Sequence, residues 1–428
     1  MKRTIAAIAL LLSLSVLAAA GASETAQTVT VWHSNTGKLG TAFDALVERF
    51  NDGIGKEKGI EIEAIYQGKA NDVLTKVKAT AGVSDLPEIA QLDATASLDM
   101  MNADYLYSVT ELGIDTSGIL PSALEALSSA RGTLAMPFNC SSLLFYYNRT
   151  LFDSLGLEPP RTLDDFIAIA PVLGEKKGEE VTRYAFAGVP TTYELCSFIG
   201  AQKGLSYLVD KENGHLGTPD QVLFGKEGTF KAFLEKWKAL YDTGFVNNLP
   251  SGVSDEFASG RTASMLASSS NLSTLISMID GRFELGTAFV PMVNEEATGG
   301  VNIGGGALYA FSDSDSVKEV LKYFTSPEAQ LYWAESTGYI PVSTELFSSS
   351  EYNGFISGNP EFKVAMDQIR ASNPKVTGVW IPSAYQIYYS FQSTVRSVTE
   401  KGLSIDEAVA TMEKEVASAL EEYSRQNR

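Results

Sequence analysis

The most distinctive pattern in the sequence is an unbroken apolar and aromatic run at residues 143–147. A run of this kind is typical of a strand that is buried on both faces. Small polar residues at 139–142 come directly before it, and Pro137 favours an extended backbone. The pattern fits an extended segment that crosses between two lobes and offers ligand contacts at its polar step. The simpler alternative, which the run by itself favours, is a core strand after a serine-rich loop.

The first part of the chain alternates between strand and helix patterns. The predicted elements are a strand at 28–33, a helix with apolar positions from 39 to 50 that stops at 51–53, a strand at 60–66, a helix at 71–81 and a strand at 88–93. This order predicts parallel strands joined by crossover helices. In such sheets ligands bind beyond the carboxyl ends of the strands, where Ser34 and Asp93 fall.

The later part of the chain continues with strands and then becomes mainly helical. The predicted strands lie at 184–187, within 260–270 and at 289–292, and one more follows three glycines at 304–306; the predicted helices lie at 162–171, 230–241, 272–278, 315–324, 327–337 and 383–401, with a last one from Ser404. Ser404 and Glu407 form a capping-box pattern for that last helix. The sequence therefore predicts an α/β protein with two sheet-based lobes, and a polar step ends each of several apolar runs, at Ser34, Asp93, Ser141, Ser268 and Gly305.

The N-terminus has the order of a secretory signal peptide. Lys2 and Arg3 precede an uncharged stretch, rich in Leu and Ala, at residues 4–20, and small residues follow at 18–22. Cleavage after Ala20 or Ala22 would release an exported protein. The alternative is a membrane anchor, although the run is at the short limit for a span.

Charge and cysteine content narrow the functional classes. The formal net charge of -19 argues against nucleic-acid binding, which depends on Lys and Arg contacts with phosphates. It says little about a small anionic ligand, because local donors can override net charge. The two cysteines, Cys140 and Cys196, can pair in an exported protein or remain two half-buried thiols.

Motifs for catalysis are not found. The sequence has no G-x-S-x-G elbow, P-loop or H-E-x-x-H motif, and its only histidines are His33 and His215. The 52 acidic residues include no pair that spacing singles out, and no spacing predicts a metal ion or another cofactor. The hydroxyl, amide and aromatic side chains at the ends of the predicted strands suit hydrogen bonding to a small polar ligand. Several aromatic residues can stack on a sugar: Trp32, Tyr147, Tyr193, Tyr339 and Trp380.

Several motifs together resemble a known family. They are W-H-S at 32–34, F-N at 50–51, M-P-F-N-C-S-S-L-L-F-Y-Y-N at 136–148, F-x-x-G-x-x-A-x-M-x-A-S at 257–268, I-G-G-G-A-L at 303–308 and T-G-Y-I-P-V at 337–342. With them the chain resembles the extracellular solute-binding proteins of ABC importers, and is most similar to their glycerol-3-phosphate-binding branch.

The resemblance implies a type II periplasmic-binding-protein fold, in which two lobes close on a ligand in the cleft between them. It implies a signal peptide at 1–22, one lobe from 23–139 and 304–345, and a second lobe from 140–303 and 346–428. By resemblance the ligand contacts are Asp93, Ser141, Ser268, Gly305 and Tyr339. No catalytic or metal-binding residue is implied.

The chain departs from the branch at several positions. Asp93 stands where the branch has Glu, Ala70 where it has Tyr, and residues 189–193 where it has tryptophans. Tyr388 stands where the branch has a phosphate-binding Arg, which a Tyr cannot replace as a bidentate cation. The next arginine along the chain, Arg396, lies two helical turns beyond Tyr388. The ligand is therefore expected to be either glycerol 3-phosphate or a sugar.

We expect a monomeric, exported, non-catalytic protein of the periplasm or another extracytoplasmic space. It would capture its ligand, close by a hinge motion and deliver the ligand to the transmembrane subunits of an ABC permease. Two alternatives stay open. One is an extracellular sensor module that signals to a membrane receptor, and the other is a secreted carbohydrate-active enzyme.

Overall fold

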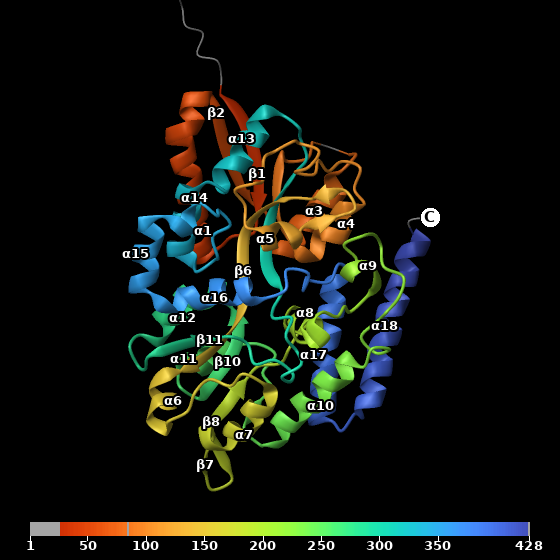
Figure 1. Ribbon diagram of the computed structural model, residues 1–428. Helices are drawn as coiled ribbons and strands as arrows, with labels where there is room; N and C mark the ends of the chain where they lie inside the picture. The colour runs from red at the N-terminus through yellow and green to blue at the C-terminus, as the bar shows by residue number, and fades with distance from the viewer. Residues whose placement is uncertain (1–25, 84, 427–428) are drawn as a thin grey trace, which may run out of the picture.

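One long strand connects the two halves of the molecule. The computed structural model describes residues 26–83 and 85–426, so the predicted signal peptide lies outside the described residues. Strand β6 (Met136–Asn148) is buried along its length except at Asn148. Its first half pairs with β12 (Ile303–Ala310), and its second half pairs with β10 (Thr262–Ser268) and β11 (Leu285–Ala288). The strand predicted at 143–147 is confirmed, and it continues through the polar step (Figure 1).

The first half of the sheet is built from the N-terminal strands. Strand β1 (Gln27–His33) pairs in parallel with β2 (Ile60–Tyr66) and β3 (Ile89–Asp93). Helices α1 (Gly37–Phe50) and α3 (Ala70–Thr80) are the crossover connections. The predicted parallel pairing is therefore confirmed. Strand β12 then runs antiparallel to both β3 and β6, which joins this half to the rest of the sheet.

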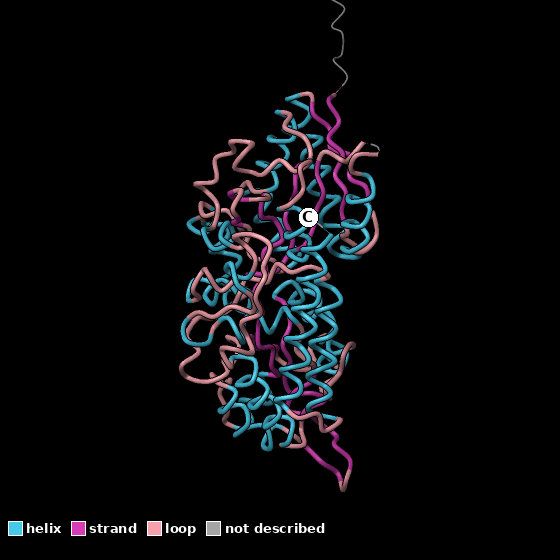
Figure 2. Tube along the Cα trace, turned by 90° about the vertical axis from the view of Figure 1, so that its right-hand side faces the viewer, coloured by secondary structure: helices cyan, strands magenta, loops and turns pink. Residues whose placement is uncertain are grey.

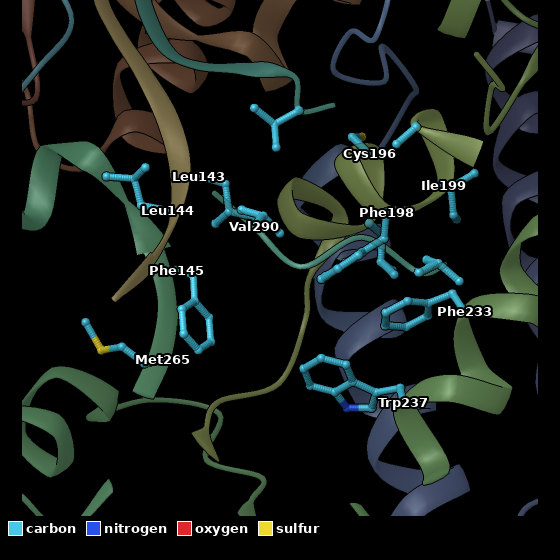
Figure 3. Close-up of a cluster of buried hydrophobic side chains, with 14 of the residues drawn as sticks. Leu143, Leu144, Phe145, Cys196, Phe198, Ile199, Phe233, Trp237, Met265 and Val290 are labelled. Carbon is cyan, nitrogen blue, oxygen red and sulfur yellow. The ribbon is translucent and has the colours of Figure 1, made fainter. Parts of the chain in front are cut away.

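The second half of the sheet extends from β10. Strand β10 pairs in parallel with β8 (Glu180–Ala187), which also pairs with β9 (Val246–Asn247) and β7 (Glu175–Lys177). Aromatic side chains fill the core beside these strands. Figure 3 shows Phe145 of β6 and, across from it, Phe198, Phe233 and Trp237. The ring centroids of Phe233 and Trp237 lie 5.6 Å apart, close enough for a stacked contact.

Helices cover both halves of this sheet and make up most of the remaining chain. They are α2 (Lys56–Lys58), α4 (Ser97–Met101), α5 (Pro121–Glu125), α6 (Arg149–Leu155), α7 (Leu163–Leu173), α8 (Thr192–Gly200), α9 (Asp210–Asn213), α10 (Thr229–Asp242), α11 (Val253–Ala258), α12 (Leu272–Ile279), α13 (Asp315–Phe324), α14 (Pro327–Thr337), α15 (Ser350–Gly358), α16 (Pro360–Ala371), α17 (Ala384–Glu400) and α18 (Ile405–Gln426). A small hairpin of β4 (Ser128–Ser129) and β5 (Gly132–Thr133) stands apart from the main sheet. The predicted capping box of the last helix is present, since Ser404 Oγ accepts from the Glu407 amide at 3.2 Å.

The stop expected at 51–53 is confirmed, because α1 ends at Phe50 and the non-helical backbone of Gly53 (φ -103°, ψ -112°) separates it from α2. The Asn51 side chain exchanges two hydrogen bonds with the backbone of Ile62 on β2. One prediction of local structure is wrong. The strand expected at 289–292 lies earlier, as β11, and Phe289 is 45% exposed.

The molecule is elongated, with strands in both of its halves (Figure 2). Its apolar core separates into one large cluster around the second half of β6 and two clusters around the N-terminal strands. The fold is the predicted two-lobe α/β fold, and β6 passes through the junction of the lobes. Within residues 26–83 and 85–426, no helix combines the length and the apolar character that a membrane span requires.

Candidate functional site

The five predicted ligand contacts gather around the middle of β6. The register of β12 sets Gly304 opposite Ser141 on β6 and Gly306 opposite Asp93 on β3. Other chain segments bring the two remaining residues to the same place. Ser268, the last residue of β10, pairs with Leu143, and the Ile340 amide donates a 2.7 Å hydrogen bond to the Cys140 carbonyl, which sets Tyr339 beside β6.

Gly305 brings two backbone segments into close approach. Its φ of +109° lies in the region that side chains rarely adopt, and a Cβ built on it would lie 1.5 Å from the Asn139 carbonyl oxygen. The lack of a side chain at Gly305 therefore permits this close approach, and the approaching group is the protein's own strand β6.

Tyr193, in the first turn of α8, lies beside Gly304, Ser141 and Ser268. A Cβ on Gly304 would meet Tyr193 Cε2 at 2.4 Å, so the ring lies against the bare backbone of that glycine. The phenol oxygen is buried beside the hydroxyls of Ser141 and Ser268, yet it makes no hydrogen bond of ordinary geometry with either of them. Burial raises the pKa of Tyr193, so this phenol stays protonated and can donate.

Asn139 adds a second buried polar atom at the same place. Its Oδ1 has no hydrogen-bond partner among the described residues, and its side chain faces Tyr339. Burial raises the pKa of Tyr339, which keeps a second phenol protonated at this junction. Buried polar atoms are normally paired, so unpaired ones at a lobe junction are candidates for contact with a ligand or with water.

Asp93 is held by groups from two parts of the chain. Its Oδ1 accepts from the Thr95 amide at 3.0 Å and also from the Thr95 hydroxyl. Its Oδ2 accepts from the Tyr385 phenol at 2.6 Å. Because β3 belongs to the first half of the sheet and α17 packs beside α10 and α18, this second bond links the two lobes.

A large cavity opens next to this bond. It has a volume of about 1250 Å³ and lies between α3 and α4 on one side and the first turn of α17 and the end of α18 on the other. Thr95 and Tyr385, the two residues that hold Asp93, both line it. Ala70, the first residue of α3, directly precedes the lining residue Asn71.

Tyr388 lies in a smaller cavity of about 160 Å³ with Thr191 and Glu194. Glu194 accepts from the Thr191 amide at 2.8 Å, and burial raises the pKa of its carboxyl more than this bond lowers it. Burial also raises the pKa of Tyr388, with Thr191 close to its phenol. No arginine lines either this cavity or the larger one among the described residues.

Sequence reasoning missed several of these groups. In the sequence Tyr385 is only a polar residue in the first turn of a predicted helix. Its contact with Asp93 joins residues 292 positions apart, which no local pattern reveals. Gln368 is buried, and its Nε2 donates to Ser142 Oγ at 2.8 Å at the polar step of β6. Tyr193 was singled out as an aromatic that can stack on a sugar, but nothing in the pattern placed it against Gly304.

The cysteines do not pair with each other. Both Cys140 and Cys196 are free and buried, so the expectation of half-buried thiols is wrong in its degree of exposure. Burial raises the pKa of each thiol to about 12. Among the described residues, no group of three or more His, Cys, Asp and Glu side chains is placed to hold a metal ion.

The lobes that share β6, with hydroxyls, phenols and a carboxylate gathered at their junction, define the two-lobe solute-binding fold. A family model described as "Bacterial extracellular solute-binding protein" matches residues 45–363, and the chain belongs to this family. The "sn-glycerol-3-phosphate-binding periplasmic protein UgpB" of Salmonella typhimurium is 27% identical over 381 residues. The protein of the same name from Escherichia coli (strain K12) is 28% identical, and each match covers 84% of both chains.

Solved structures share the fold. UgpB from Mycobacterium tuberculosis, in complex with glycerophosphocholine, has a TM-score of 0.75 at 22% identity and covers 94% of this chain and 99% of its own. The GacH receptor of Streptomyces glaucescens, solved with acarbose, has a TM-score of 0.76 at 21% identity and covers 93% of this chain and 99% of its own. The resemblance seen in the sequence motifs and the two-lobe fold are thereby confirmed.

Proposed function

We propose that this chain is the exported solute-binding component of an ABC importer and that it captures an uncharged sugar. On this proposal the ligand contacts are Asp93, Ser141, Ser268, Gly305 and Tyr339. The two lobes, divided as the sequence suggests at residues 139/140, 303/304 and 345/346, close on the ligand and present it to the permease. The protein performs no catalysis and acts as a monomer.

The observation that carries the sugar assignment is the charge of the site. Lys78 is the only cation that lines the large cavity among the described residues, and its Nζ lies 2.9 Å from Asp99 Oδ2. Asp93 adds a carboxylate beside this cavity, since Thr95 and Tyr385, which both line the cavity, donate to its two oxygens. A phosphate needs fixed cations or a cluster of free amides, whereas carboxylates and phenols suit sugar hydroxyls.

Glycerol 3-phosphate is the second candidate. It is supported by the names of the relatives, since the UgpB proteins that match over 84% of this chain are described as binding it. The Tyr388 position argues against it, because a phenol carries no positive charge for a phosphate, whereas the Arg of the branch does.

A thermal-shift titration tests the two candidates. The chain without residues 1–22 is titrated with glycerol 3-phosphate, glycerol, and a panel of neutral mono- and oligosaccharides, because a ligand of the native state raises the melting temperature with its concentration. We expect saturable shifts with one or more neutral sugars and none with glycerol 3-phosphate. A shift with glycerol 3-phosphate alone would contradict the sugar assignment.

Substitution of the central carboxylate locates the site. Asp93→Asn should weaken the sugar-induced shift, because an amide loses the charged acceptor while the shape is kept. Asp153→Asn, at an exposed position on α6, is the matched control and should leave the shift unchanged. Equal shifts in both variants would place the ligand away from Asp93. No shift with any ligand would overturn the solute-binding proposal itself.

A further inference from the structure

The imidazole ring of His215, just after α9, lies between three groups from other parts of the chain. Its Nδ1 is 3.0 Å from the Ser128 carbonyl oxygen, and its Nε2 is 3.0 Å from the Gly378 carbonyl oxygen. The ring also stacks on Trp380, with the two centroids 3.8 Å apart. Only 5% of His215 is exposed, and it lines neither of the two cavities described above. This contact is therefore separate from the proposed ligand site.

The groups on the two sides of His215 belong to different lobes. Ser128 lies on the β4–β5 hairpin, and Arg131 of that hairpin donates to the Ala103 carbonyl at 2.7 Å in the N-terminal half. On the other side Leu208, a few positions before His215, is buried in the large apolar cluster around the second half of β6. The imidazole therefore bridges the lobes. Helices α5 and α9, which flank it, can be located near the middle of the molecule in Figure 1.

The backbone that delivers His215 to this place is strained. Lys211, Glu212 and Asn213 have φ values of 54°, 53° and 58°, and Gly214 follows with a φ of 87°. The left-handed region is unfavourable for residues with a side chain, and here three such residues adopt it in succession. A turn of this kind persists only where surrounding contacts hold it. The turn at 211–214 would therefore relax if the contact of His215 were released.

The charged groups that face His215 come from three segments. They are Glu125 of α5, Glu212 of α9 and Lys375 of the connection between α16 and α17. Lys375 Nζ lies 2.8 Å from Glu212 Oε2 and 3.3 Å from Glu125 Oε1. The hydrogen bond to Glu212 raises the pKa of Lys375, which therefore stays charged. One cation is thus already paired with both carboxylates, and a protonated His215 would add a second cation to the cluster.

Neither protonation state of His215 is well matched to its surroundings. Both polar neighbours of the ring are carbonyl oxygens, which only accept, whereas a neutral imidazole has a single N–H. In the neutral form one carbonyl oxygen therefore faces a ring nitrogen without a proton. An imidazolium would donate to both oxygens, but burial lowers the pKa of His215 more than the carbonyls and the two carboxylates raise it.

A small cavity beside the ring gives protons access to it. Its volume is about 70 Å³, which is enough for water, and the buried hydroxyl of Thr377 in its wall has no hydrogen-bond partner among the described residues. We propose that His215 is an acid-sensitive latch between the lobes: the neutral ring holds the turn at 211–214 against the hairpin at 128–133, and protonation releases it. This inference goes beyond the proposed function and requires no ligand.

The direction of the effect follows from proton linkage. A solvated histidine has a pKa of 6.5, and the ring at the junction has a lower one. Well above pH 6.5 neither state binds the proton, and the contact has its full strength. As pH falls below 6.5 the released state binds the proton first, so the contact weakens. The equilibrium constant for release rises by up to about tenfold for each pH unit that separates the two pKa values.

Hydrogen exchange measured by mass spectrometry tests the latch directly. The chain without residues 1–22 is compared at pH 7.5 and pH 5 without ligand, and the rates are corrected for the intrinsic pH dependence of exchange. The informative peptides cover 128–133 and 211–217. The Ala130 amide reports the contact itself, because it donates to the His215 carbonyl at 3.3 Å.

Two variants assign the effect to one of the two histidines of the chain. His215→Gln keeps one N–H donor for a carbonyl and cannot titrate. His33→Asn is the matched control, because its side-chain oxygen can accept from the Asn35 amide as His33 Nδ1 does. Other groups that titrate in this range, such as Glu194, are present in every variant and cancel in the comparison.

We expect the corrected exchange of both peptides to accelerate at pH 5 in the unsubstituted chain and in His33→Asn, but not in His215→Gln. The ring resonances of His215 in the unsubstituted chain should titrate below pH 6.5 by NMR, a measurement that does not depend on the folding of a variant. Exchange that is independent of pH, the same acceleration in His215→Gln, or a His215 titration at or above pH 6.5 would overturn the latch. None of these results bears on the sugar titrations of the proposed function.

Discussion

The phenol of Tyr385 donates a 2.6 Å hydrogen bond to Asp93 Oδ2, although 292 positions separate the two residues. Asp93 ends β3 in one lobe, and Tyr385 lies in the first turn of α17 in the other. Burial, together with the charge of Asp93, raises the pKa of Tyr385, so the phenol remains the donor. The bond therefore holds the lobes together through the same carboxylate that is proposed to meet the ligand.

Removing this link should loosen the junction of the lobes. We expect Tyr385→Phe to lower the free energy of unfolding by about 1–2 kcal/mol, the range for a hydrogen bond to a charged but partly exposed group. The radius of gyration without ligand should rise. Denaturant unfolding and small-angle X-ray scattering measure these two quantities.

Tyr389→Phe is the control for this prediction, because Tyr389 lies on the same helix and is 63% exposed. It should change neither quantity. If the two phenylalanine variants gave the same scattering curve, the Tyr385–Asp93 bond would not contribute to holding the lobes.

The second prediction concerns the close approach at Gly305. Gly305→Ala places a methyl group 1.5 Å from the Asn139 carbonyl oxygen at a φ of +109°, so either strand β6 or strand β12 must move. We expect a loss of more than about 4 kcal/mol, the range seen for severe backbone and packing conflicts. Soluble yield and melting temperature report it.

Gly354→Ala provides the matched control within helix α15. No atom lies within 4 Å of the added Cβ, and alanine is the better helix former by up to about 1 kcal/mol. This variant should melt at the same temperature as the unsubstituted chain or higher. A Gly305 variant that melts as high as the Gly354 variant would show that the two strands do not approach as closely as described.

Local sequence signals predict the elements well where caps mark both ends. Helices α13 and α14 have the expected bounds, because Ser314 and Ser326 cap their N-termini and Gly338 follows α14 in the left-handed conformation. Between 285 and 292 no such cap is present, and the apolar residues there did not reveal which of them pair with β6. The periodicity of apolar residues predicts which positions are buried, but it does not predict which strand they pair with.

The candidate site was only partly predictable for a related reason. Asp93 and Ser268 are polar residues at strand ends, which a sequence pattern can reveal. The contacts of Tyr385 with Asp93 and of Tyr193 with Gly304 join residues far apart in the chain, and no local pattern encodes them. Whether the five predicted residues contact the ligand stays a prediction.

A pH prediction follows from Glu194. Burial raises the pKa of its carboxyl above the ordinary value of 4.5. The unfolded chain therefore loses this proton more readily than the folded chain, so the stability that this group contributes is lost as pH rises from about 4.5 through the higher folded pKa. The loss is about 1.4 kcal/mol for each pH unit that separates the two pKa values. The amide in Glu194→Gln cannot titrate.

The unfolding free energy of Glu194→Gln, relative to the unsubstituted chain, should thus rise with pH across this window and become constant above it. Denaturant unfolding between pH 4 and pH 8 measures it. Glu421→Gln, at an exposed position of α18, should run parallel to the unsubstituted chain throughout. A parallel curve for Glu194→Gln as well would mean that this carboxyl titrates normally in the folded protein.

The side chain of Gln368 on α16 forms hydrogen bonds with β6 at Ser142 and Leu143, the end of its polar segment. Its Nε2 donates to Ser142 Oγ at 2.8 Å and to the Leu143 carbonyl at 2.5 Å, and its Oε1 accepts from the Val290 amide at 2.7 Å. The residue is 2% exposed, so water cannot replace these bonds directly. Gln368→Ala leaves these groups without their partner, and we expect a cost of about 3 kcal/mol.

The neighbouring Asp367→Ala separates this effect from a general weakening of α16. Asp367 makes a surface ion pair with Lys363 one turn earlier, and such pairs contribute at most about 0.5 kcal/mol. Denaturant unfolding of both variants should therefore differ by more than about 2 kcal/mol. Because Ser142 follows the predicted contact Ser141 directly, Gln368→Ala should also weaken sugar binding, while Asp367→Ala should not. Equal unfolding midpoints for the two variants would mean that the hydrogen bonds of Gln368 do not stabilise β6 beyond its strand pairing.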